Sequence, residues 1–97
     1  WGAPAALVQL PDKRLVCAYG YRQKPWGIRA RVSHNRGLTW GEEIILRDDG
    51  GSWDLGYPRM HLRPDGSLIT VYYFNSREDR IQCHGGVRHI AATLWEI

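Results

Sequence analysis

The chain has 97 residues and a formal net charge of +3, which is enough length for one small domain or for part of a larger one. Its first residue is Trp1 instead of Met, which favours a fragment or a processed chain. A hydrophobic content of 43% with five Trp and five Tyr excludes a disordered polypeptide, and no run approaches the roughly 18 apolar residues of a membrane helix.

The basic residues are strongly biased in type. Eleven of the thirteen are Arg and two are Lys. A guanidinium group presents a planar fork to carboxylates and phosphates, so this bias favours an anionic ligand. The alternative is a solvated surface that follows from an Arg-rich coding bias. Nucleic-acid binding is not predicted, because the basic residues alternate along strands instead of forming a continuous patch.

The first part of the chain predicts three antiparallel strands. An apolar run at 5–10 ends at Pro11-Asp12, which is a turn signal. The next run, 14–21, is too continuously apolar for a half-exposed strand, so we expect burial on both of its faces. After a loop at 22–26, apolar residues alternate with Arg over 27–32, which is the period of a strand with one solvated face.

A tight hairpin turns this strand back into a fourth one at 42–46. Ser33 and Asn35 are short polar residues that can accept backbone N–H groups, and Gly37 tolerates a positive φ. We expect Trp40 to begin the return strand and to fold its indole under the loop as an apolar plug. The four strands then form a small meander sheet.

The same pattern returns after a polar, Gly-rich segment at 48–55. Three pairs of segments recur with a spacing of 53 to 54 residues: 2–4 and 56–58, 11–12 and 64–65, and 15–19 and 68–72. Repeats of roughly 40 to 50 residues with four strands each are typical of β-propeller blades. The second unit continues through a long loop, 75–88, to a strand at 89–97, and it stops one strand short.

The hairpin Ser-His-Asn-Arg-Gly-Leu-Thr-Trp resembles the Asp-box, Ser-x-Asp-x-Gly-x-Thr-Trp, of sialidase-like β-propellers, with Asn35 in the place of the Asp. Gly-Tyr-Pro, Pro-Asp-Gly-Ser-Leu, Val-Tyr-Tyr and Ile-Ala-Ala-Thr-Leu-Trp follow in the order of such repeats, so the resemblance covers nearly the whole chain. In that family the box braces a blade far from the catalytic centre. It therefore marks the fold and not the function.

The resemblance implies an all-β fold made of antiparallel four-stranded meander sheets, as two blades of a six-bladed sialidase-like propeller. The first blade would cover 1–47 with the hairpin at 33–40, and an inter-blade loop would cover 48–55. The second blade, 56–97, would lack one strand. This arrangement is that of the C-terminal two blades of such a propeller.

The same resemblance suggests a catalytic residue. Sialidases use a Tyr nucleophile backed by a carboxylate, because a neutral phenol repels the substrate's carboxylate less than Asp or Glu would. Tyr57, at the entry to an innermost strand, matches the place of that Tyr, although Pro58 follows it where the family usually has Ser. The alternative is a Tyr that packs at a strand entry.

Further ligand contacts are implied in the loops beside Tyr57. Arg22 and Arg59 are candidates for binding a carboxylate, and Asp54 lies next to them in the predicted arrangement. Trp26 and Trp53 lie in or beside the same loops. The alternatives are surface arginines on the blades and an Asp that caps a turn.

The acid/base of sialidases and the Glu partner of their Tyr lie in earlier blades. The resemblance therefore implies a fragment of a glycan-recognising propeller, from the exo-sialidase or glycosidase class, that is not catalytically complete alone. The alternative function is a non-catalytic structural module that oligomerises through its blade faces. The expected partners are a glycan or another anionic small ligand, together with a homotrimer of two-blade chains or the remainder of a larger propeller.

No cofactor or metal is predicted. Cys83, His84 and His89 are ligand types that suit zinc, but no fourth ligand has a fixed spacing to them. Cys17 lies in a strand pattern and Cys83 in a loop pattern, so we expect two free thiols instead of a disulfide.

Overall fold

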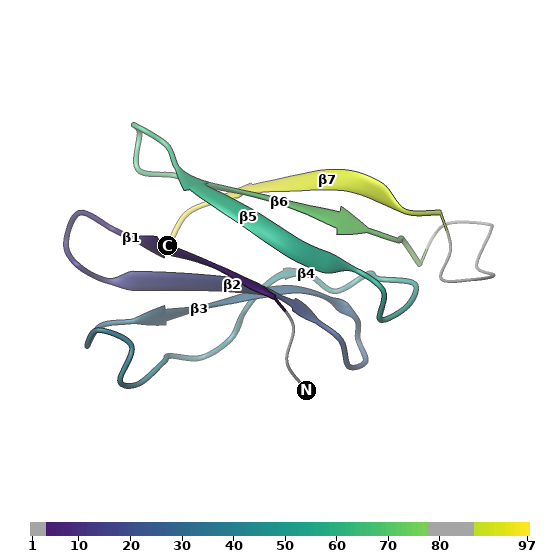
Figure 1. Cartoon of the computed structure of the whole chain (residues 1–97), viewed down its shortest axis with the longest axis horizontal. Helices are drawn as coiled ribbons and strands as arrows, with labels where there is room; N and C mark the ends of the chain where they lie inside the picture. The colour runs from purple at the N-terminus through teal and green to yellow at the C-terminus, as the bar shows by residue number, and fades with distance from the viewer. Residues whose placement is uncertain (1–3, 78–86) are drawn as a thin grey trace.

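The computed structural model describes residues 4–77 and 87–97, which form two antiparallel β-sheets (Figure 1). The first sheet has the strand order β1 (Ala5–Gln9), β2 (Leu15–Tyr21), β3 (Gly27–Ser33) and β4 (Ile44–Arg47). In the described residues the second sheet has three strands, in the order β5 (Gly56–Leu62), β6 (Leu68–Phe74) and β7 (His89–Trp95). The predicted all-β class with antiparallel sheets is confirmed.

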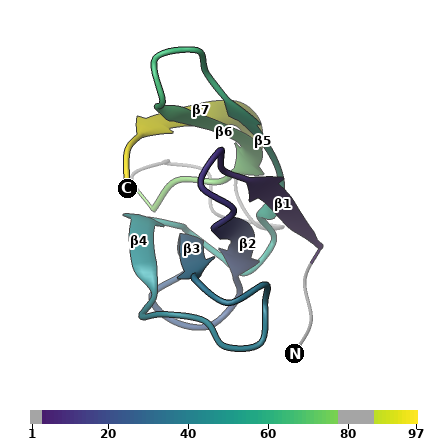
Figure 2. The same ribbon diagram turned by 90° about the vertical axis from the view of Figure 1, so that its left-hand side faces the viewer.

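The two sheets lie one above the other, with β1 and β5 on the same side of the molecule (Figure 2). Two apolar clusters fill the space between them. The buried members of the first are Leu10, Val16, Val32 and Leu68. Those of the second are Ile28, Leu55, Tyr72 and Phe74. Each cluster contains residues of both sheets, so neither sheet buries its inner face without the other.

The β1–β2 and β5–β6 turns are built in the same way, which makes the sequence repeat visible in the backbone. In each turn an Asp carboxylate accepts the backbone N–H two residues later, at 3.1 Å for Asp12 and 3.0 Å for Asp65. The residue after each Asp has a positive φ, 79° at Lys13 and 89° at Gly66. A left-handed residue costs little at glycine and more at lysine, because only lysine has a Cβ.

The hairpin between β3 and β4 is closed by two side chains. Ser33 Oγ accepts the backbone N–H of Asn35 at 3.3 Å and that of Gly37 at 2.8 Å. Asn35 Oδ1 accepts the Thr39 N–H at 2.9 Å, and Asn35 Nδ2 donates to Thr39 Oγ1 at 2.7 Å. Gly37 has a φ of 87°, the left-handed conformation that this tight loop requires.

Trp40 does not begin the return strand, so this prediction was wrong. The strand β4 starts at Ile44, and Trp40 is 36% exposed before it. The reason lies in the intervening residues, whose polar groups bind side chains of the sheet. The Gly41 carbonyl accepts a hydrogen bond from Arg31 Nη1 at 3.0 Å, and the Glu43 carboxylate binds Arg29.

The prediction that β2 is buried on both faces was also wrong. Burial alternates along the strand, with Val16 and Ala18 fully buried and the residues between them only partly covered. The apolar run is continuous, but neighbouring side chains of a strand point to opposite faces. In the described part of the chain, the second sheet covers one of these two faces.

The alternation in β6 has the opposite phase. Its buried residues are Leu68, Thr70, Tyr72 and Phe74. At the repeat spacing of 53 they match Leu15, Cys17, Tyr19 and Tyr21, which form the partly covered side of β2. The sheets thus meet through opposite faces of the same repeat. This packing is head to tail. In the repeat, the outer face of the first sheet is equivalent to the inner face of the second, and the outer face of the second is equivalent to the inner face of the first.

Candidate functional site

The segment between the two sheets carries Trp53 and Asp54. It is tied to the end of β6, because Gly51 N donates to Asn75 O at 2.9 Å. The fully buried Asn75 side chain donates from Nδ2 to the Asp54 carbonyl at 2.8 Å. One backbone bond and one side-chain bond thus tie the segment that carries Asp54 to the end of β6.

Two glycines allow the sheets to approach closely beside this segment. A Cβ on Gly20 would lie 3.1 Å from the Gly56 Cα, so β2 and β5 touch here backbone to backbone. Gly56 has a φ of 114° and Tyr57 a φ of 46°, and the β5–β6 register shifts between Gly56 and Arg59. This irregularity turns Tyr57 outward, where 58% of it is exposed.

Asp54 is the centre of a polar network that joins three elements. Its Oδ1 accepts a hydrogen bond from the Tyr73 hydroxyl of β6 at 2.6 Å. Its Oδ2 accepts one from Arg88 Nε, just before β7, at 2.7 Å, and Arg88 Nη2 is ion-paired with the same oxygen. Each carboxylate oxygen thus has its own partner, Tyr73 at Oδ1 and Arg88 at Oδ2, and these charge-assisted bonds fix the orientation of the carboxylate.

The network lowers the pKa of Asp54 and raises the pKa of Tyr73. The hydrogen bond from Tyr73, followed by the hydrogen bond and charge of Arg88, lowers the pKa of Asp54 below its ordinary value of 3.8. Burial and the Asp54 carboxylate raise the pKa of Tyr73 to about 12. Around neutral pH Asp54 is therefore an ionised carboxylate and Tyr73 a neutral phenol.

Arg22 stands over two exposed aromatic rings next to this network. Its Cζ lies 5.8 Å from the centre of the Trp53 ring and 5.7 Å from that of Tyr57. Arg22 Nη2 also donates to the Leu55 carbonyl at 3.3 Å. The Tyr57 and Tyr73 rings are 5.7 Å apart, so the aromatic rings connect Arg22 to the Asp54 network.

The structure brings four of the six candidate residues together: Arg22, Trp53, Asp54 and Tyr57. Arg59 lies elsewhere, exposed along a groove of about 530 Å³ between β1 and β5 that it lines together with Tyr57. Trp26 packs against the buried cluster of Ile28 and its neighbours, so its position is that of a core residue.

Two residues of the network were not singled out from the sequence. Tyr73 is the tyrosine that holds a carboxylate, and it occupies a strand position that alternation alone assigns to one face of a sheet. Arg88 ends the long loop and meets Asp54 only after the chain has passed through β6. The sequence offers one signal for Tyr73. At the repeat spacing of 53 residues, its equivalent in the first unit is Gly20, so the second unit has a tyrosine where the first has no side chain.

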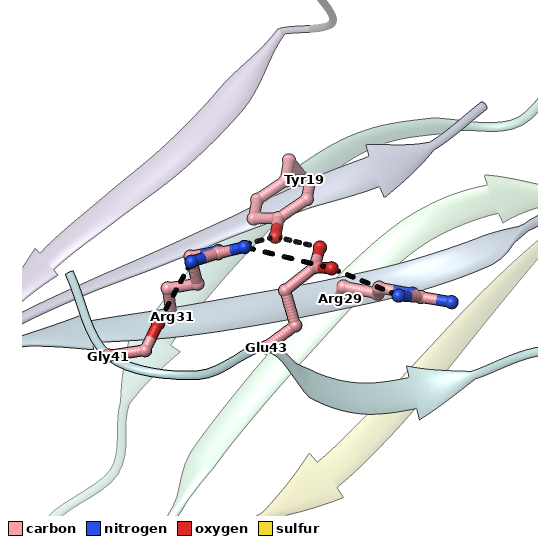
Figure 3. A network of polar contacts seen from close by, with 5 residues as sticks. All are labelled: Tyr19, Arg29, Arg31, Gly41 and Glu43. Carbon is pink, nitrogen blue, oxygen red and sulfur yellow. Dashed lines mark hydrogen bonds and ion pairs between the residues drawn. The ribbon is translucent and has the colours of Figure 1, made fainter. Parts of the chain in front are cut away.

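A second polar network lies on the outer face of the four-stranded sheet (Figure 3). The Tyr19 hydroxyl of β2 donates to Glu43 Oε2, and Arg29 Nη1 of β3 donates to Glu43 Oε1 at 3.0 Å. Arg31 Nε donates to the Tyr19 hydroxyl at 3.3 Å, and Arg31 Nη2 lies 3.7 Å from Glu43 Oε1. The hydrogen bond from Tyr19, followed by that from Arg29, lowers the pKa of Glu43, so this carboxylate is ionised.

A pocket of about 290 Å³ lies beside the second network. Tyr19, Tyr21 and Glu43 line it together with Arg22. Arg22 thus faces both the exposed aromatic rings and this pocket.

Other chemistry finds little support in the described residues. Within 4–77 and 87–97, no group of three His, Cys, Asp or Glu side chains could hold a metal ion. Cys83 and His84 lie outside the described residues, and the His89 ring packs on Phe74. No described helix is long and apolar enough to cross a membrane.

No protein-family model matches the chain, and no curated protein is significantly similar to it. Among solved structures, the chain is similar to a protein of unknown function from Dyadobacter fermentans DSM 18053, with 41% identity and a TM-score of 0.82. The match covers 99% of this chain and 25% of that one. The chain thus spans about a quarter of the length of its solved relative and shares its all-β architecture over that part.

Proposed function

We propose that the chain is a two-blade portion of a sialidase-like β-propeller and that it binds a glycan or a similar anionic ligand at Arg22, Trp53 and Tyr57. The observation that carries the proposal is the position of Arg22 over two exposed rings, with its Cζ within 5.8 Å of both ring centres. Exposed aromatic rings offer rigid apolar faces for a sugar ring, and a guanidinium binds a carboxylate.

The electrostatics of the neighbouring network support binding more than catalysis. An ionised Asp54 cannot donate a proton as a general acid, and the pKa of Tyr73, raised to about 12, keeps its phenol from acting as a nucleophile near neutral pH. Tyr57 remains the candidate nucleophile from the family resemblance. The described residues around it include no carboxylate that hydrogen-bonds its hydroxyl.

The head-to-tail packing supports the propeller part of the proposal. Sheets that meet through opposite faces of one repeat can be stacked further with the same rotation, and such stacking closes into a ring when the angle allows it. The matched part is 25% of the chain of the solved relative, which leaves length in that protein for further sheets of the same kind. We therefore propose the remainder of a larger propeller as the partner of the two sheets.

A structural module is the second candidate, in which two-blade chains associate into a trimer of six blades. The observation that favours it is the apolar outer face of β7, where Ile90 is 72% and Leu94 59% exposed. Exposed apolar side chains in one patch are typical of an interface. In this case no ligand would be needed for function.

Titration with sialic acid, followed by tryptophan fluorescence, tests the binding proposal. We expect a saturable change in emission that disappears in Trp53→Ala and weakens in Arg22→Gln. Trp40→Ala is the matched control, because Trp40 is exposed in the hairpin and takes no part in the site. A neutral methyl galactoside should compete weakly or not at all. A flat titration with folded protein, or a change that needs Trp40 and not Trp53, would contradict the proposal.

A further inference from the structure

The outer face of the four-stranded sheet carries a cluster of charged side chains. We call this surface the Tyr19 face and define it by Tyr19, Arg29, Arg31 and Glu43 (Figure 3). The Arg29 side chain is only 11% exposed and stacks on the Tyr21 ring at 3.5 Å, whereas Arg31 is 40% exposed. One arginine of the Tyr19 face is thus already covered within the chain, and the other is open to solvent.

The internal repeat shows how a neighbouring sheet would cover this face. Tyr19 pairs with Arg29 and Cys17 with Arg31, as Tyr72 pairs with Ala91 and Thr70 with Thr93 in the second sheet. In that sheet the equivalent face is covered, because Tyr72 belongs with Ile28 of β3 to one buried cluster, and Ala91 packs against it. A sheet that packs in the same way on the Tyr19 face would place its own equivalent of Ile28 against Arg29.

The charges decide what such a sheet must contain. The second sheet has uncharged residues where the Tyr19 face has two arginines, and Glu43 balances only one of them. Arg22 lines the adjoining pocket and adds a further positive charge. Covering this face with an apolar surface would bury a net positive charge, which is costly without a paired anion.

We propose that the Tyr19 face docks a β-sheet that presents a carboxylate opposite Arg29 and Arg31, and that this sheet is not the three-stranded sheet of a second copy. The proposal rests on the head-to-tail stacking described above. Charge complementarity identifies the occupant as an acidic sheet face, because a carboxylate of the docked sheet would balance the arginine charge that Glu43 leaves unbalanced.

A second copy does not have this chemistry. Its strands β5, β6 and β7 contain no Asp or Glu at any position, and the Asp54 carboxylate that binds Tyr73 beside them is already ion-paired with Arg88. The residue that takes the place of Ile28 is Ile90, since Gly20 pairs with Ile28 as Tyr73 pairs with Ile90. A copy would therefore bring an isoleucine to the two arginines, and a homotrimer would leave each Tyr19 face without its anion.

A carboxylate introduced at position 90 tests this, because a second copy of the chain would then present the missing anion to the Tyr19 face. We expect the native chain to be a monomer by light scattering and Ile90→Glu to associate head to tail. Its dissociation constant should be about tenfold or more below that of the neutral control Ile90→Gln. Ile90 is 72% exposed, so both variants should keep the fold, which circular dichroism checks. Added salt and Arg31→Gln in the Ile90→Glu background should each reduce the association.

A charge-swapped pair, Ile90→Lys with Arg31→Glu, gives a second arm if Ile90→Glu fails to fold. It should associate, and Ile90→Lys alone should not. Equal behaviour of the Glu and Gln variants would overturn the charge argument. A native trimer that Ile90→Glu disperses would overturn it too, but would support the stacking itself. Neither result depends on the sialic acid titration, so the two proposals fail independently.

Discussion

Lys13 and Gly66 occupy the same place in two equivalent turns, which isolates the effect of a left-handed residue. Lys13 has a φ of 79° and Gly66 of 89°, and nothing lies within 4 Å of a Cβ built on Gly66. We expect Lys13→Gly to raise the free energy of unfolding by about 0.5 to 1 kcal/mol and Gly66→Ala to lower it by about 1 kcal/mol. Urea denaturation measures both. Equal signs for the two changes would contradict the shared geometry.

The pair of Tyr73 and Asp54 should make stability depend on pH at both ends. The pKa of Asp54 is lowered in the folded chain, so its contribution is present above the ordinary value of 3.8 and is lost as pH falls through the folded pKa. The pKa of Tyr73 is raised to about 12, so its contribution is complete below the ordinary value of 10.0 and is lost as pH rises toward 12.

Tyr73→Phe tests this pH dependence. It removes the donor to Asp54, so the loss of stability in acid and the loss between about pH 10 and 12 should both become smaller. Thermal unfolding across pH measures the stability, and absorbance titration counts the tyrosines that ionise late. An unchanged alkaline limb in the Phe variant would show that another group is responsible.

Among single residues, the family resemblance put Arg22, Trp53, Asp54 and Tyr57 in neighbouring loops, and the structure brings these four together. It did not name Tyr73 or Arg88, since a strand residue and the last residue of a long loop meet Asp54 only through pairing of β5, β6 and β7. Contacts between residues far apart in the sequence cannot be predicted from local patterns.

Among the elements, the hairpin from Ser33 to Trp40 gives a local test. Asn35→Ala removes both bonds to Thr39 and should cost about 1 to 2 kcal/mol of unfolding free energy. Asn35→Asp keeps the acceptor, and the Thr39 hydroxyl can donate to it, so the cost should stay within about 0.5 kcal/mol at neutral pH. Chemical denaturation compares the two variants. A larger loss for Asp than for Ala would mean that the amide donor dominates the loop.

The two sheets also provide a matched pair of equivalent positions. Ile28 on β3 is fully buried, and Ile90 on β7 is 72% exposed, although both occupy the same place in the repeat. Ile28→Ala should lower the free energy of unfolding by about 2 to 5 kcal/mol, because it leaves a cavity between the sheets. Ile90→Ala should change it by less than about 0.5 kcal/mol in the isolated chain. A large loss at Ile90 would indicate that its face is already covered in solution.

For the molecule as a whole, we expect no hydrolysis of a fluorogenic sialoside. Asp54 is ionised, Tyr73 is neutral, and the family resemblance puts the acid/base in other blades. The assay follows release of the fluorophore with the purified chain, and a full-length sialidase serves as the positive control. Turnover that disappears in Tyr57→Phe would contradict this expectation and would identify Tyr57 as the nucleophile.

The sequence alone predicts most of the local features: the order of the strands, the two Pro-Asp turns, the polar hairpin and the repeat. These follow from side-chain alternation and from backbone preferences of neighbouring residues, which need no distant contact. Tertiary packing selects the buried face of each strand, because the run in β2 is apolar on both sides and the second sheet covers one of them. It also decided where Glu43 goes, since its partners Tyr19 and Arg29 reach it only once β2, β3 and the approach to β4 lie side by side. Long-range pairing, and not local preference, thus assembles both polar networks.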